Sequence, residues 1–182
     1  MARLVTTRGG GLVSGPSPGG PATRHASEEH VQAVACAVLD EIGLLWAHPP
    51  NEALQRGGML YGALQVGQGV KTGLPDVLIF EAPPSTPEAR GVAIELKTEI
   101  GSPSPDQKRW LAALSARGWA ATVERGTDAF LARLRALGWD VEAALGRLRS
   151  RGVTVVAGRL VVDSAAMKRA AGLRAGGPAG RE

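Results

Sequence analysis

Apolar and polar positions along the chain alternate with helical and strand periods, and they predict a series of short elements. Ser27 is a good N-cap for a helix that carries apolar residues at helical spacing as far as Ile42, and Gly43 ends it. The same patterns predict further helices at about 52–66, 104–117, 128–137, 141–149 and 164–173, strands at about 44–47, 76–80, 92–97 and 119–123, and a hairpin at 153–163. This order of elements is typical of an α/β sandwich built on a mixed sheet flanked by helices.

Two of these strands lie at the centre of the prediction. The strands at 76–80 and 92–97 are joined by a polar connection with three prolines, which favours an antiparallel hairpin. The helix that follows presents an apolar stripe that includes Trp110. Trp110 and Trp119 are therefore expected in the core rather than on a surface that stacks against bases.

The two ends of the chain differ in composition from the middle. Many of the 25 glycines and 12 prolines lie near the ends, so residues 1–26 are expected to be a disordered arm and residues 174–182 a disordered tail. Residues 27–138 are expected to form the main domain. Residues 139–173 have a helix-hairpin-helix pattern and are expected to form a small C-terminal extension, which is short for a unit that folds alone.

Charge and cysteine content narrow the class of protein. The net charge of +4 and the pI near 9.8 suit a protein that binds a polyanion, without requiring one. Cys36 is the single cysteine, so an intrachain disulfide and a cysteine-based zinc site are both excluded. The sequence has no apolar run of signal-peptide or transmembrane length, which predicts an intracellular, cytoplasmic protein with no membrane partner.

The most informative polar residues are Asp76, Glu95 and Lys97. Glu95 and Lys97 occupy alternate positions of one strand and therefore share a face, while Leu96 points to the opposite face. If the hairpin pairs as predicted, Asp76 lies beside Glu95. Two converging carboxylates repel each other unless a cation lies between them, and with the Leu96 backbone carbonyl they offer oxygen ligands suited to Mg²⁺ or Mn²⁺.

That grouping has a functional and a structural interpretation. A divalent metal at this place would polarise a phosphodiester and activate water, and Lys97 would orient the water or stabilise the transition-state charge. The alternative is a structural ion pair between Glu95 and Lys97, with Asp76 capping a turn after Pro75. An isolated E-x-K favours the structural interpretation, whereas a preceding P-D and hydrophobic strand favour the catalytic one.

The segments that carry these residues resemble the VRR-NUC family, a branch of the PD-(D/E)XK nucleases, over roughly residues 27–137. They are SEEHVQ, HPPNE, GVKTGLPDVLIF, GVAIELKTEIGSPSPDQKRWLAAL and GWAATVERGTDAFLARL. The resemblance implies a restriction-endonuclease-like core of order αβββαβ and nuclease activity on DNA. One departure is Glu52, which follows Asn51 where the family usually has glycine, and it puts that loop in doubt.

The resemblance also implies further site residues. The family places a glutamate on the first helix near the metal, and Glu28 is favoured over Glu29 because it lies nearer the inward face and stands four residues before Gln32. Either acid could instead be a first-turn residue favoured by the helix dipole. Gln107 matches a glutamine typical of the family and would contact the water, the lysine or the phosphate. Its alternative is an exposed helix residue.

Three residues are expected on the DNA side of the cleft. Lys71, in the loop before Asp76, would bind the phosphate backbone. Asn51 and His48 would line the same side, although a solvated role is as consistent with the sequence.

The leading hypothesis is a metal-dependent DNA endonuclease, acting on branched, flap or junction DNA as relatives do. The alternative is a catalytically silent DNA-binding or assembly module of a phage or mobile-element replication or repair complex. A homodimer would enlarge the small DNA footprint. The extension at 139–173 weakly resembles docking domains of the TubC type, so it could bind a protein partner. It could equally mediate dimerisation or grip DNA, since it is rich in arginine and lysine.

Overall fold

The computed structural model describes residues 26–49 and 71–166. The predicted arm, tail and helix at 52–66 lie outside these residues, as does Asn51, and only the first turn of the last predicted helix falls within them. The helices are α1 (Glu28–Ile42), α4 (Pro105–Ser115), α5 (Gly126–Ala136) and α6 (Val141–Ser150), and the strands are β1 (Trp46–Ala47), β2 (Val77–Ile79), β3 (Val92–Lys97), β4 (Ala120–Arg125), β5 (Val153–Val156) and β6 (Arg159–Val162). Their order is the predicted one, with bounds that differ by a few residues.

The main sheet has the strand order β1-β2-β3-β4. β2 pairs antiparallel with both β1 and β3, which confirms the predicted hairpin, and β3 pairs in parallel with β4. A parallel pair needs a crossover connection, and α4 supplies it. The fold is therefore the predicted α/β arrangement with a mixed sheet flanked by helices.

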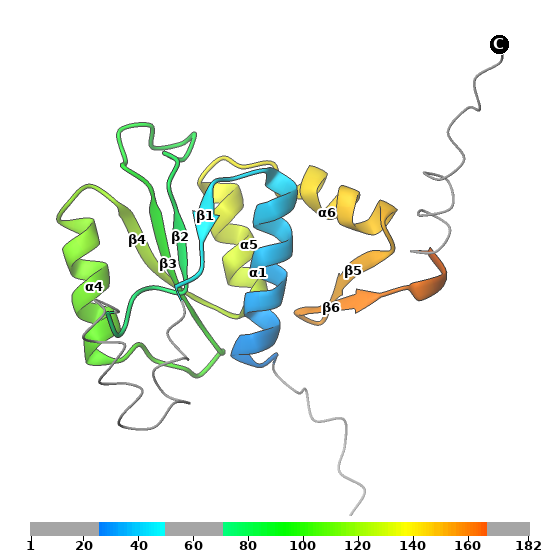
Figure 1. Ribbon diagram of the computed structural model, residues 1–182, viewed down its shortest axis with the longest axis horizontal. Coiled ribbons are helices and arrows are strands. Elements are labelled where there is room, and N and C mark those ends of the chain that lie inside the picture. The colour runs from blue at the N-terminus through cyan, green and yellow to red at the C-terminus, as the bar shows by residue number, and fades with distance from the viewer. Residues whose placement is uncertain (1–25, 50–70, 167–182) are drawn as a thin grey trace, which may run out of the picture.

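The helices cover the two faces of the sheet. α1 and α5 lie together on one face and α4 lies on the other (Figure 1). The hydrophobic core fills the space between the sheet and the α1–α5 pair. β3 is buried along its whole length because it is a central strand with covered faces.

The prediction that Trp110 and Trp119 lie in the core is wrong. Trp110 and Trp119 are half-buried and take no part in the core, and α4 has no fully buried residue. The Trp110 indole N–H instead donates to the carbonyl of Thr72 at 3.0 Å, and the Trp119 ring meets the Phe80 ring edge-on with centroids 6.1 Å apart. The apolar side chains of α1 and α5 supply the core on the opposite face of the sheet. The tryptophans therefore pack outside this core.

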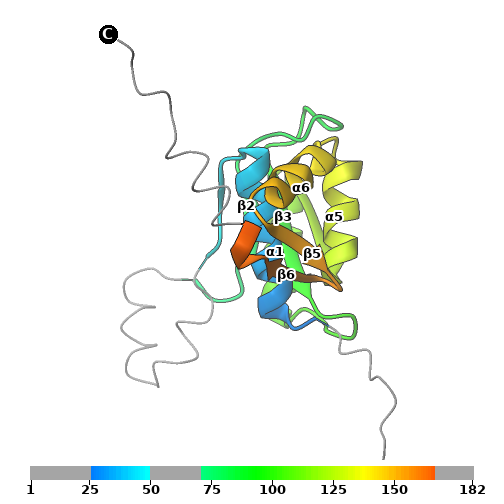
Figure 2. The ribbon, with the colours of Figure 1, turned by 90° about the vertical axis from the view of Figure 1, so that its right-hand side faces the viewer.

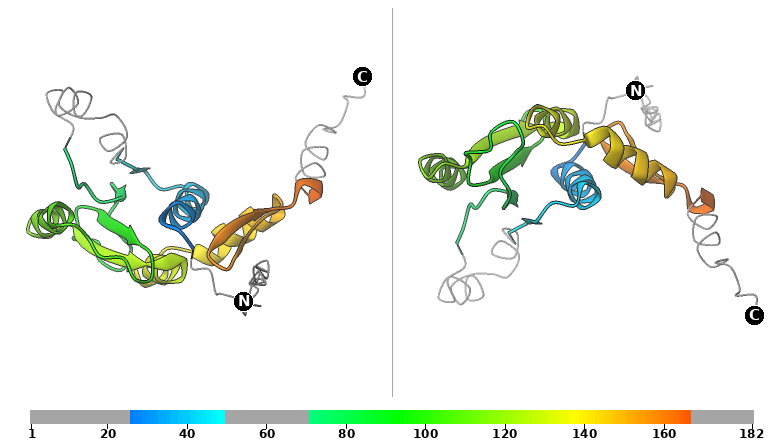
Figure 3. Two further views of the ribbon diagram at one scale, coloured as in Figure 1. Left: turned by 90° about the horizontal axis from the view of Figure 1, so that it is seen from below. Right: turned by 90° about the horizontal axis from the view of Figure 1, so that it is seen from above.

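The C-terminal elements pack against the main body. Val141, Ala144 and Leu148 of α6 belong to the same hydrophobic core as α1. Both Arg147 and Arg151 form ion pairs with Glu41 at the end of α1. The hairpin of β5 and β6 lies beside α1, below α6 (Figure 2), and Figure 3 shows that the whole extension projects from the α1 side of the sandwich.

Candidate active site

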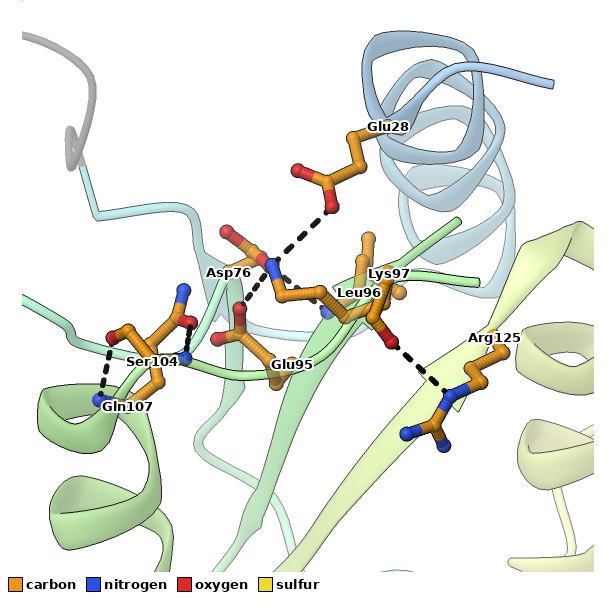
Figure 4. Close-up of polar contacts among 9 residues, drawn as sticks. Glu28, Asp76, Glu95, Leu96, Lys97, Ser104, Gln107 and Arg125 are labelled. Atoms are coloured by element: carbon orange, nitrogen blue, oxygen red, sulfur yellow. Dashed lines mark hydrogen bonds and ion pairs between the residues drawn. The ribbon is translucent and has the colours of Figure 1, made fainter. Parts of the chain in front are cut away.

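The predicted catalytic residues meet at one edge of the sheet. Parallel strands end at the same edge, so the carboxyl ends of β3 and β4 lie side by side, with Lys97 opposite Arg125. The loop after β3 lies beside the first turn of α1 at the lower edge of the molecule (Figure 1). Figure 4 shows Asp76, Glu95, Lys97 and Glu28 converging there.

Asp76 is held against the end of β3. The register pairs Val77 with Ile94, which brings Asp76 opposite Glu95, and the Leu96 N–H donates to Oδ2 of Asp76 at 2.8 Å. The N–H and C=O of a strand residue point to the same side of the strand. The Leu96 carbonyl is therefore expected on the Asp76 side of the strand, and its role as a metal ligand stays a prediction.

Glu95 is the most unusual group of the site. Its side chain is 0% exposed, and both carboxylate oxygens are buried. The Lys97 ammonium lies 2.6 Å from Oε1 and is the charged partner of that oxygen, whereas Oε2 has no donor among the described residues. Burial raises the pKa of Glu95 to about 7, with Lys97 opposing the rise and the charge of Asp76 adding to it.

The charges of Asp76 and Lys97 respond to the same surroundings. Burial raises the pKa of Asp76 above its ordinary value, although the hydrogen bond from Leu96 and the charge of Lys97 oppose it. Burial alone would lower the pKa of Lys97, but the ion pair with Glu95 and the charges of Asp76 and Glu28 outweigh it and raise that pKa. Lys97 thus carries its positive charge at neutral pH.

Of the two candidate glutamates on α1, the structure brings Glu28 to the site. Both glutamates are exposed, but Oε1 of Glu28 lies 3.5 Å from Nζ of Lys97. Ser27 begins α1 by accepting a hydrogen bond from the His30 N–H, so Glu28 comes first in the helix, above the end of β3. Its partner in the structure is the lysine ammonium rather than the carboxylates.

His48 and the loop before Asp76 support the aspartate. Nδ1 of His48 lies 2.7 Å from the Asp76 carbonyl oxygen. The hydroxyl of Thr72 donates to Asp106 at 3.2 Å, which ties the loop to the start of α4. Lys71 is exposed at the beginning of that loop.

Gln107 has a local structural role. Its Oε1 accepts from the Ser104 N–H at 2.7 Å and its own N–H donates to the Ser104 hydroxyl, so the two residues form a capping box at the start of α4. Figure 4 shows this pair on the α4 side of Glu95.

Sequence reasoning missed Arg125. It ends β4, and its Nε donates to the carbonyl of Gly101 at 3.3 Å, beside Lys97 (Figure 4). Arg125 lies opposite Lys97 because β3 and β4 pair in parallel. That register depends on the folded sheet, so the sequence alone gave no signal for Arg125.

Comparison with known proteins shows the family and the fold. The family model described as the VRR-NUC domain matches residues 20–128 of the sequence, which is more than half of the chain. The chain belongs to the VRR-NUC family. A solved structure described as a VRR_NUC domain protein superposes with a TM-score of 0.50 at 22% sequence identity, covering 63% of this chain and 90% of that one, which supports the fold. No curated protein matches the chain.

Membership of the VRR-NUC family makes the chain a nuclease in general terms, and such families use divalent metals. Among residues 26–49 and 71–166, no group of three or more His, Cys, Asp or Glu side chains could hold a metal ion by itself, and no helix is long and apolar enough to cross a membrane. Asp76 and Glu95 nevertheless lie opposite each other at the end of β3. The buried Oε2 of Glu95, which has no donor among the described residues, fits an oxygen-preferring cation.

Proposed function

We propose that this chain is a metal-dependent DNA endonuclease, in which Asp76, Glu95 and the Leu96 carbonyl hold Mg²⁺ or Mn²⁺. The observation that supports this most directly is the buried Glu95 carboxylate, which lies opposite Asp76 and whose Oε2 has no donor among the described residues, since Lys97 is paired with Oε1. Lys97 offsets one negative charge, so a further cation would stabilise Asp76 and Glu95 together as carboxylates.

Each side chain then has a defined task. When bound, the metal supplies a Lewis acid for the phosphate and lowers the pKa of water. Lys97 carries its charge at neutral pH and orients the attacking water or stabilises negative charge on the phosphate. Glu28 holds the Lys97 ammonium from the α1 side, or approaches the metal through water. His48 positions Asp76 through its carbonyl.

Further contacts are proposed to position the substrate. Lys71, exposed in the loop before Asp76, binds the phosphate backbone. Asn51 lies three residues after His48 in the sequence, and both are proposed to line the DNA side of the site. Gln107 is fixed by its capping box close to Glu95, from where its amide contacts water or phosphate. The preferred substrate is branched, flap or junction DNA, and a homodimer would enlarge the DNA footprint.

The test is cleavage of labelled linear duplex, single-stranded, flap and four-way-junction DNA with Mg²⁺, Mn²⁺ or EDTA. We expect Asp76→Asn and Lys97→Ala to lower the rate by roughly 10²–10⁴-fold, because each removes charge stabilisation in the transition state. Lys108→Ala removes an exposed lysine from α4 and serves as the matched control, with a rate within about threefold of wild type.

Two results would contradict the proposal. Equal cleavage by wild type and both site variants would mean that the activity does not arise at this site. DNA binding by wild type without cleavage under any metal condition would favour the catalytically silent binding module, with or without a protein partner bound through residues 139–173.

A further inference from the structure

A tight turn follows β3 directly and presents one apolar side chain. Residues 98–101 form this turn, closed by a hydrogen bond of 3.0 Å from the Gly101 N–H to the Thr98 carbonyl. Ile100 lies at its tip with 91% of its surface exposed, three residues after Lys97. Single exposed apolar residues are ordinary on protein surfaces. Its position beside the candidate active site is what sets Ile100 apart.

The turn is held from both sides. A Cβ on Gly101 would lie 3.2 Å from Cβ and 3.3 Å from Cδ of Lys97, so Gly101 packs on the stem of that lysine. Nε of Arg125 donates to the Gly101 carbonyl at 3.3 Å. A Cβ on Gly126 would overlap Oε1 of Glu99, so the Glu99 carboxylate lies against the backbone there. Glu99 and Ile100 are both exposed, and Ile100 is the apolar side chain that the turn presents.

The charges beside the turn are mixed, with Lys97 and Arg125 among the acids Glu28, Glu95 and Glu99, so Arg125 is the group placed to bind a phosphate. Glu99, the one acid of the turn, is directed at the N-terminus of α5, where the helix dipole and free N–H groups favour a carboxylate. Arg125 uses Nε for Gly101, which leaves the outer N–H groups of its exposed side chain available to a phosphate. A strand whose phosphate reaches Lys97 would bring its neighbouring bases to Ile100.

We propose that Ile100 is a wedge that packs against an exposed base face next to the scissile phosphate, while Arg125 binds a flanking phosphate. This inference rests on the proposed nuclease function and supplies its substrate preference. Inserting an apolar side chain into an intact stack requires neighbouring bases to unstack, which is unfavourable. That cost is much smaller where a flap, junction or single-strand boundary has already interrupted the stack.

The first test is binding without catalysis. A duplex with a single-stranded flap carries 2-aminopurine at the boundary, and its fluorescence is followed on titration with protein in EDTA. Wild type should raise the fluorescence because the wedge unstacks the probe. Ile100→Ala should give less than about a third of that rise, and Ile100→Met, which keeps an apolar side chain, should restore it. Leu45→Ala is the matched control, because Leu45 is 66% exposed and lies at the opposite end of β2 from Asp76.

The second test is cleavage in Mg²⁺. Ile100→Ala should lower kcat/KM on flap or junction DNA by roughly 10-fold and on linear duplex by less than about threefold. Arg125→Gln should weaken binding of all these DNAs to a similar extent. Equal loss on every substrate would mean that Ile100 serves the structure of the turn, and unchanged fluorescence and cleavage would mean that it contacts something other than DNA. Either result overturns the wedge.

The two proposals can fail separately. A fluorescence rise that depends on Ile100, together with no cleavage in any metal, would leave the wedge in place and remove the nuclease. Metal-dependent cleavage that depends on Lys97, with no fluorescence rise, would do the reverse.

Discussion

At the scale of single residues, the main feature of the candidate site is a cluster of ionisable side chains that is largely buried. Glu95 is completely buried, Lys97 is 7% exposed, and Asp76 lies opposite Glu95. Burial raises the pKa of both acids, and the acids together raise the pKa of Lys97. Without a cation, the cluster therefore holds an extra proton near neutral pH, and a divalent ion that displaces this proton would bind more tightly as the pH rises.

This charge arrangement predicts a pH-dependent stability. The pKa of Glu95 is about 7 in the folded chain and near 4.5 in the unfolded one, so the folded state binds more protons between these values. Metal-free wild type should therefore lose stability as the pH rises from about 5 to 8, by roughly 1–3 kcal/mol from this group. Glu95→Gln should show a smaller loss, since Asp76 alone then titrates. Urea unfolding in EDTA at pH 5 and at pH 8 measures this change in the free energy of unfolding.

Glu142→Gln is the control for that experiment, because Glu142 is an exposed acid paired with Arg135. It should keep the pH dependence of wild type. An equal free energy of unfolding for wild type at both pH values would show that the pKa of Glu95 is not raised in the folded chain. Adding Mg²⁺ should recover more stability at pH 8 than at pH 5.

At the scale of elements, close backbone packing positions the loop that carries Asp76. Gly73 has a φ of +75°, and a Cβ there would lie 2.6 Å from Cβ of Asp106 at the start of α4. Glycine is required for both reasons, since other residues adopt this backbone region with strain and no space exists for a side chain. The contact joins the Asp76 loop to α4, whose own start is fixed by Ser104 and Gln107.

Gly73→Ala should therefore disturb the site as well as the fold. We expect a loss of stability of about 2–4 kcal/mol, the sum of backbone strain and a clash, and at least a tenfold loss of cleavage because Asp76 is displaced. Gly43→Ala is the matched control: its φ is +86°, but nothing lies within 4 Å of the added Cβ. It should cost only about 1–2 kcal/mol of strain and leave cleavage unchanged. Equal effects of both variants would contradict the packing argument.

At the scale of the whole molecule, the C-terminal elements share the core of the main body. The family match ends at residue 128, within α5, yet α6 contributes three side chains to the core around α1. The hydroxyl of Thr127 also donates to the carbonyl of Gly158 at 2.9 Å, linking α5 to the hairpin of β5 and β6. We expect these parts to unfold together.

Leu148→Ala tests this cooperativity. Leu148 lies between α6 and the core, so its truncation should lower the free energy of unfolding by about 2–4 kcal/mol and shift one common transition. Val161→Ala, at an exposed position of β6, should change it by less than about 0.5 kcal/mol. Two separate transitions, of which only the smaller responds to Leu148→Ala, would show that the extension unfolds by itself.

Much of the fold and the centre of the site could be predicted from the sequence, because those features follow from local chemistry. Ser27 and Gly43 bound α1 through caps that involve only neighbouring residues. The strand period of two set Glu95 and Lys97 on one face, and the hairpin brought Asp76 opposite Glu95. The family resemblance over these segments is confirmed by the family match.

The tertiary structure decided what depends on distant segments meeting. Arg125 reaches the site because β4 pairs in parallel with β3, and the wedge geometry of Ile100 depends on contacts from β4 and α5. Trp110 and Trp119 are apolar enough for a core, but the core formed on the other face of the sheet. The contact of His48 with Asp76 likewise required the folded sheet. Local sequence thus determined the elements and the candidate catalytic motif, whereas long-range packing determined which further residues surround it.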